Sequence, residues 1–125
     1  MVSLRTALVA AALVAGGAGA ALAHHGWAWT LDEDFVLEGT IEEIYLGNPH
    51  ATLDVDVDGE IWRIELAPPR QTERAGFTEA SAKVGDEITA IGNRSHDDTE
   101  KRMKAVRLTV GGKTYDVYPG RAPSN

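Results

Sequence analysis

Residues 53–65, with the sequence LDVDVDGEIWRIE, predict a β-hairpin, and this hairpin decides the fold class. Apolar and acidic residues alternate before Asp58-Gly59, a period of two that is typical of a half-buried strand. Asp58-Gly59 itself is a two-residue turn of the kind that joins antiparallel strands. Closing it sets three cross-strand pairs, two apolar and one charged: Val55–Trp62, Leu53–Ile64 and Asp54–Arg63. Because the apolar pairs share one face and the charged pair lies on the other, the predicted register is self-consistent.

Four further segments show the strand pattern: residues 35–46, 87–93, 103–110 and 113–118. The side-chain parity of the first switches at Glu42-Glu43, which predicts a β-bulge. Pro68-Pro69 ends the second strand of the hairpin because proline cannot donate to a β-ladder, and residues 70–75 then predict a short helix.

Three strands, a short helix and two more strands are the order of an OB-type barrel, a five-stranded Greek-key closure. We therefore predict an all-β fold: a small OB-like antiparallel barrel with a short helix between strands three and four, and residues 113–118 added to it. A small β-sandwich is the alternative, but it needs no helix after its third strand. The polar segment 94–102 predicts a mobile loop, and residues 119–125 a frayed tail. The residues predicted inside the barrel are Val55, Trp62, Ile64, Val106 and Leu108.

One calcium-binding motif matches the sequence but is rejected. Asp54, Asp56 and Asp58, followed by a glycine and then Glu65, have the spacing of an EF-hand loop. An EF-hand loop needs a helix on each side, whereas this segment is the predicted hairpin. In the hairpin register the aspartates lie along one strand and Glu65 lies opposite Thr52, so the four carboxylates do not converge on one ion.

The composition limits the partners of this chain. Its 125 residues include 12 Lys and Arg against 19 Asp and Glu, a formal net charge of −7. Nucleic-acid affinity depends mainly on clustered cations, so a nucleic-acid function and docking onto anionic lipid are both disfavoured. The chain has no cysteine, which excludes disulfides, thiolate nucleophiles, zinc fingers and iron–sulfur clusters. Any metal site must use His, Asp, Glu, Met or the backbone.

Residues 1–23 predict a cleavable signal peptide, which leaves residues 24–125 as one exported domain, periplasmic or secreted. The segment has one charge, Arg5, followed by an uncharged run rich in Ala and Gly over residues 7–23. This run is shorter and less apolar than the roughly 20 residues of a membrane-spanning helix. It ends in Ala-Leu-Ala at residues 21–23, a small-x-small cleavage pattern. A cut after Ala20 is the alternative, and it would leave three extra residues before His24.

Cleavage after residue 23 makes His24 the N-terminal residue, and this predicts a copper site. The α-amine and the ring Nδ1 of an N-terminal histidine can chelate one metal, and a second imidazole completes a three-nitrogen histidine brace. Nitrogen-rich tetragonal sites suit Cu(II). His50 follows a rigid Asn-Pro dipeptide and is the predicted second imidazole, while His25 and Met103 are further candidate ligands. His96 lies in the polar loop and is predicted to be solvated.

Other interpretations of the same residues stay open. The N-terminus of an exported protein can be arbitrary, and packing of Trp27 and Trp29 on the barrel can be the only role of its first residues. His50 can be a structural, hydrogen-bonded residue. The sequence shows no Ser-His-acid set, no nucleophile elbow and no phosphate-binding glycine loop, so it predicts no enzyme.

Five short motifs carry a resemblance to a known family: HHGW at residues 24–27, LEGTI at 37–41, GNPH at 47–50, GF at 76–77 and VGDEI at 84–88. In this order they resemble a domain-of-unknown-function family of small exported bacterial proteins, over residues 24–118. Members of that family typically start with His-His-Ser and carry a Thr-Asn-Pro-His turn. This chain has Gly26 and Gly47 in place of the serine and the threonine. The resemblance implies export and an OB-like β-fold, and it implies no activity.

Two classes of function follow from these observations. The first is an exported copper-binding protein that uses His24 and His50, with His25 or Met103 as a further ligand. The second is a metal-free OB-like module that binds a small molecule, an envelope polymer or a protein partner.

Overall fold

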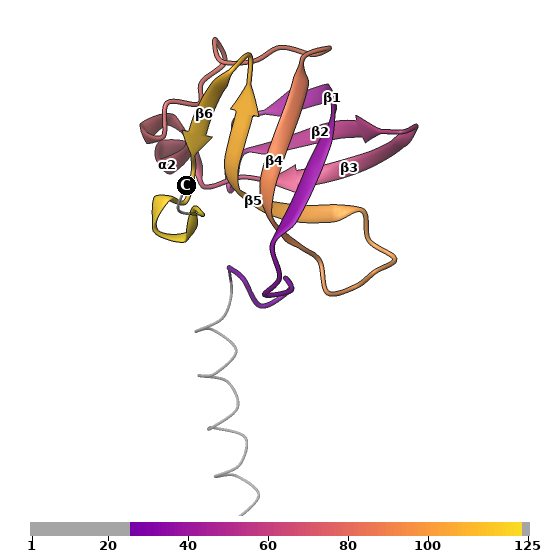
Figure 1. Cartoon of the computed structure of the whole chain (residues 1–125). Helices are drawn as coiled ribbons and strands as arrows, with labels where there is room; N and C mark the ends of the chain where they lie inside the picture. Colours follow the sequence, from indigo (N-terminus) through magenta and orange to yellow (C-terminus); the bar gives the residue numbers. More distant parts are fainter. Residues whose placement is uncertain (1–25, 124–125) are drawn as a thin grey trace, which may run out of the picture.

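In the computed structural model, which describes residues 26–123, the secondary-structure elements follow one another in the predicted order (Figure 1). The elements are β1 (Phe35–Tyr45), β2 (Thr52–Val57), β3 (Glu60–Glu65), α2 (Pro69–Arg74), β4 (Glu87–Arg94), β5 (Arg102–Val110), β6 (Lys113–Asp116) and the 3-10 helix η1 (Pro119–Arg121). No helix in residues 26–123 is long and apolar enough to cross a membrane. The predicted signal peptide at residues 1–23 lies outside the described residues.

The strands form a closed barrel with an additional edge strand. Their order is β3-β2-β1-β4-β5-β6, and β3 also pairs with β5, which closes β1 to β5 into a ring. Every pair is antiparallel except the closing pair of β3 and β5, which is parallel. Five strands closed in this way, with a short helix between β3 and β4, form the predicted OB-type barrel. Strand β6 adds to β5 outside the ring, also as predicted.

The hairpin of β2 and β3 has the predicted register. Val55 pairs with Trp62, Leu53 with Ile64 and Asp54 with Arg63. The two residues of the turn both have positive φ, 53° at Asp58 and 87° at Gly59, as a tight hairpin turn requires. The predicted bulge in β1 is also present, because the register of β1 against β2 shifts between Ile41 and Glu43.

Two glycines allow the strands to approach closely enough for closure. A Cβ at Gly92 would lie 2.0 Å from the carbonyl oxygen of Lys104, and a Cβ at Gly39 would lie 2.3 Å from that of Asp56. Neither distance leaves room for a side chain.

Strand β5 pairs with two different strands along the edge that does not face β4. Its residues 102–104 pair with β3, and its residues 107–110 pair with β6. The start of β5 therefore lies against the end of β3, and this contact forms the candidate site described below.

The buried apolar side chains that pack against one another inside the barrel form the core cluster. Four of the five predicted interior residues belong to it: Val55, Trp62, Ile64 and Leu108. The prediction for Val106 is confirmed for its burial, but not for packing inside the barrel. Val106 is buried, but it lies outside the core cluster, whereas Met103, Ala105 and Leu108 lie within it. The register of β4 against β5 shifts at this point, so the side-chain parity of β5 changes between Ala105 and Leu108.

The polar loop between β4 and β5 and the C-terminal tail differ from the prediction. Ser95 is 1% exposed, and its Oγ donates to Glu100 and accepts from the backbone N–H of Asp97. Asp97 in turn accepts from the N–H and the hydroxyl of Thr99. These bonds make the loop an ordered turn, because its polar side chains satisfy one another. Residues 119–121 form η1, where the tail was predicted to fray.

Candidate functional site

The first described residues, 26–30, lie against the end of β4 and the start of β5, and we call them the N-terminal strap. The backbone of the strap is fixed at several points. The Nζ atom of Lys104 donates to the carbonyl oxygen of Gly26 at 2.8 Å. The N–H of His96 donates to the carbonyl oxygen of Trp29 at 2.9 Å, and Thr30 forms an isolated β-bridge with Ser95. Residues far apart in the sequence thus hold the strap in one place.

Cation–aromatic contacts hold the side chains of the strap. The guanidinium carbon of Arg102 lies 3.7 Å from the ring centre of Trp29. Around Trp27, the guanidinium carbon of Arg121 lies at 3.9 Å and the ammonium nitrogen of Lys104 at 4.7 Å. Such contacts contribute about 0.5–2 kcal/mol each, more as they lose water. These contacts fix the orientation of both rings at the edges of the strap.

A cavity of about 150 Å³ opens beneath the strap, lined by Gly26, Trp29, His50, Glu65, Arg102 and Lys104. The barrel topology places this cavity. His50 comes from the segment between β1 and β2, Glu65 from the end of β3, and Arg102 and Lys104 from the start of β5. The β1–β2 and β4–β5 connections of OB-folds commonly form ligand sites. We take this cavity as the candidate site.

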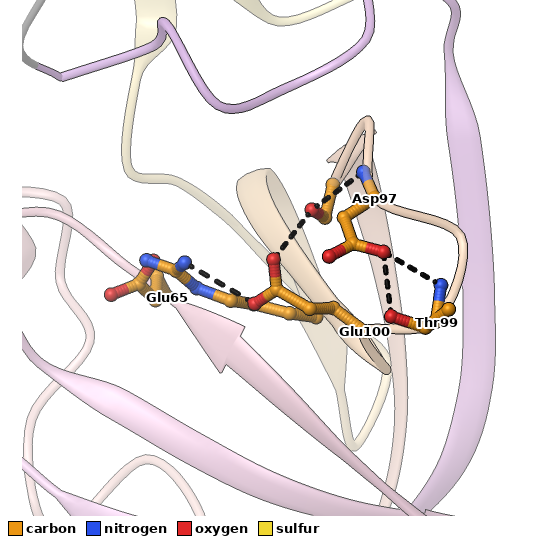
Figure 2. A network of polar contacts seen from close by, with 6 residues as sticks. Glu65, Asp97, Thr99 and Glu100 are labelled. Atoms are coloured by element: carbon orange, nitrogen blue, oxygen red, sulfur yellow. Dashed lines mark hydrogen bonds and ion pairs between the residues drawn. The ribbon is translucent and has the colours of Figure 1, made fainter.

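The cavity carries more positive than negative charge. Glu65 Oε2 accepts from Arg102 Nε at 3.0 Å and from Arg102 Nη2 at 2.6 Å. Arg102 Nη1 also lies 3.6 Å from the carboxylate of Glu100, which belongs to the polar network of the β4–β5 loop (Figure 2). Lys104 is only 4% exposed, and none of the ion pairs within residues 26–123 includes it. Burial lowers the pKa of Lys104, and burial raises the pKa of the neighbouring Tyr118 hydroxyl.

The structure separates the sequence-predicted ligands. His50 is half-buried and lines the cavity, whereas His96 is exposed on the β4–β5 loop. His24 and His25 lie outside the described residues. Met103, the further candidate ligand, is fully buried in the hydrophobic core and is not among the residues that line the cavity.

The carboxylates of the rejected calcium motif lie apart in the structure. Asp54, Asp56 and Asp58 lie along β2 and its turn, and Glu65 pairs with Thr52 at the other end of the hairpin. Within residues 26–123 no group of three or more His, Asp or Glu side chains is placed to hold a metal ion.

Three residues of the cavity were not predicted from the sequence: Glu65, Arg102 and Lys104. They meet only because β3 pairs with β5 in parallel, with Arg63 opposite Arg102 and Glu65 opposite Lys104. No local pattern indicates this pairing, since the two segments are separated by the helix and β4. One signal in the sequence could have indicated that Lys104 is buried. This lysine stands between the apolar residues Met103 and Ala105, and both of these residues are buried in β5.

Fold and cavity together define a small OB-fold protein with a half-buried histidine under its N-terminal strap. Residues 11–104 match the model of a family described as a family of unknown function, DUF6152, and the chain belongs to this family. The match begins within the predicted signal peptide. No curated protein matches the chain. Among solved structures, the chain is similar to one from the S. pombe Stn1–Ten1 complex, with 18% sequence identity and a TM-score of 0.49. That similarity covers 62% of this chain and 57% of the other.

Proposed function

We propose that this protein is an exported Cu(II)-binding protein that holds the metal with the α-amine and imidazole of His24 and the imidazole of His50. His25 is the alternative ligand from the N-terminus, with its ring in place of that of His24. The observation that carries the proposal is the shared cavity of Gly26 and His50.

The position of Gly26 beside His50 supports the proposal that the N-terminal histidines reach the cavity. Consecutive Cα atoms lie about 3.8 Å apart, so the Cα of His24 is at most about 7.6 Å from that of Gly26. The carbonyl of Gly26 is held by Lys104, which limits where the preceding residues can go. Such anchoring favours metal binding, because less chain entropy is lost when the ligands converge.

The donor chemistry favours copper. An α-amine has an ordinary pKa of about 7.7–8.0 and an imidazole one of about 6.5, so neutral nitrogen donors are available near neutral pH. A site of three nitrogen atoms matches the tetragonal preference of Cu(II), which also binds most tightly among the divalent first-row metals. The amine becomes a ligand only if the signal peptide is cut after Ala23.

Replacing His50 tests the proposal. In a chain that starts at His24, His50→Ala should weaken Cu(II) binding at least about tenfold, or about 1.4 kcal/mol, because one imidazole ligand is lost. His96→Ala is the matched control, since it removes an exposed histidine, and should leave the affinity unchanged. Isothermal calorimetry gives both values, and a thermal melt of each variant verifies its fold. Equal affinities of the wild type and His50→Ala would contradict the proposed ligand set.

A metal-free binding module is the second candidate. A larger cavity of about 600 Å³ also borders the strap, lined by Gly26, Trp27, Ala28, Thr30, Leu31, Asp32, Asn93 and Arg121. Its volume is in the range of small-molecule sites, about 300–1,000 Å³. Its mixture of apolar and charged side chains suits a small polar molecule. This function becomes the preferred one if the chain that starts at His24 does not bind copper.

A further inference from the structure

A cavity of about 310 Å³ lies beside α2 and shares no lining residue with the cavity under the strap. Its lining comes from the end of β1, from α2 and from the segment that follows α2: Leu46, Pro69, Thr72, Glu73, Phe77, Thr78 and Glu79. We call it the α2 cavity. Because the N-terminal histidines and His50 take no part in this lining, the α2 cavity is separate from the proposed copper site.

The apolar side chains of the α2 cavity are continuous with the core. Phe77 is 1% exposed, and its ring packs edge-to-face on that of Tyr115, with 5.3 Å between the ring centres. Leu46 is half-buried and packs against the core cluster. Such a lining favours the apolar body of a ligand. The volume is at the low end of the range for small-molecule sites, about 300–1,000 Å³, which suits a body of about one ring.

Hydrogen bonds fix the turn that carries Glu79. The N–H of Thr78 donates to Ser81 Oγ at 2.8 Å, and Ser81 Oγ donates to the carbonyl oxygen of Gly76 at 3.1 Å. Gly76 has a φ of 93°, the left-handed conformation that commonly follows the end of a helix. This wall of the α2 cavity is therefore formed before any ligand binds, so little chain entropy is lost on binding.

The polar side chains of the α2 cavity offer acceptors and negative charge. Glu73 and Glu79 are exposed, and none of the ion pairs within residues 26–123 includes either of them. The hydroxyl of Thr72 donates to the carbonyl oxygen of Ala67 at 2.8 Å, so its oxygen can only accept a further bond. No Lys, Arg or His is among the described residues that line the cavity. An ammonium group, with three donors and no acceptor, complements this lining.

We propose that the α2 cavity binds a small organic cation, a primary ammonium group on an apolar body of about one ring. The body lies against Phe77, and the ammonium group lies at Glu73 and Glu79. Because both carboxylates are exposed, the ammonium group keeps part of its water, and the cost of burying a charge is avoided. Binding is non-covalent, and no proton is transferred.

Phenethylammonium is a suitable probe, because it joins one aromatic ring to a primary ammonium group. The ¹⁵N-labelled chain that starts at His24 is titrated in the presence of a metal chelator, so that copper takes no part. The amide signals of Thr72, Phe77 and Thr78 should shift in a saturable way in the NMR spectrum. 2-Phenylethanol has the same body without the charge and should bind at least about fivefold more weakly.

Two variants test the role of the carboxylates. In the double variant Glu73→Gln with Glu79→Gln, the dissociation constant of phenethylammonium should rise at least about fivefold, as expected for two exposed charge pairs. The affinity for 2-phenylethanol should not change, because the apolar lining is intact. Glu38→Gln is the control: it removes an exposed carboxylate of β1 outside the cavity, and the dissociation constant should stay within about twofold.

Three results would overturn the inference. The first is the absence of saturable shifts at the α2 cavity up to about 10 mM phenethylammonium. The second is equal affinity of the wild type and the double variant. The third is an equal loss in Glu38→Gln, which would show attraction to the net charge of the protein instead of the cavity. His50→Ala should bind phenethylammonium like the wild type, so this proposal and the copper site fail independently.

Discussion

Trp62→Ala should lower the free energy of unfolding by about 3–5 kcal/mol, the usual cost of deleting a large aromatic side chain from a packed core. Trp62 is 7% exposed and lies opposite Val55 in the hairpin. Its ring stacks on that of Phe35, with 5.2 Å between the ring centres. Arg94 adds a cation–π contact, with its guanidinium carbon 5.1 Å from the Trp62 ring centre. The variant loses the apolar burial and both of these ring contacts.

Urea denaturation of the wild type and the variant measures this loss. Ile61→Ala is the matched control, because Ile61 precedes Trp62 in β3 but is 50% exposed. This control should cost less than about 1 kcal/mol, as expected for an exposed strand position. An equal loss of stability in both variants, or a loss near zero for Trp62→Ala, would mean that the side chain of Trp62 is not part of the packed core.

Retaining Ala21-Leu22-Ala23 before His24 should weaken Cu(II) binding at least about a hundredfold, or about 2.7 kcal/mol. The extension turns the α-amine of His24 into a peptide nitrogen, which in its neutral form has no lone pair available for the metal. The chelate ring between this nitrogen and Nδ1 is therefore lost.

Isothermal calorimetry of the extended and authentic chains provides the comparison. A chain with Ala-Leu-Ala added after Asn125 is the control, and it should bind copper like the authentic chain. If the N-terminally extended and the authentic chains bound copper with the same affinity, the brace would be excluded, and the metal-free binding module would replace it.

The hairpin was predictable because its signals are local. The Asp58-Gly59 turn and the alternation on both sides of it determine the pairing of Val55 with Trp62 without any other part of the chain. The order of strands around a short helix was enough to predict the barrel. The parity of β5 was not predictable, because the shift at Val106 arises where β5 leaves β3 and joins β6. The order of the β4–β5 loop was missed because hydrogen bonds of its polar side chains, such as that of Ser95 with Glu100, replace apolar burial.

The candidate site shows the same division. His50 was predicted from its own neighbourhood, a rigid Asn-Pro-His turn, and the structure places it in the cavity under the strap. Glu65, Arg102 and Lys104 were not predicted, because only the parallel pairing of β3 with β5 brings them together. Hydrogen bonds and cation–π contacts between distant residues determine the position of the strap, as for Trp29 with Arg102. The placement of His24 and His25 remains a prediction.

The electron paramagnetic resonance spectrum of the copper-loaded chain that starts at His24 tests the central claim most directly. The claim is that one Cu(II) ion binds both the N-terminal amine with its histidine ring and the imidazole of His50. The account predicts hyperfine coupling to three nitrogen atoms in the wild type and to two in His50→Ala. Identical spectra of the wild type and His50→Ala would contradict it, because the metal would then be bound without the residue that the barrel places beneath the strap.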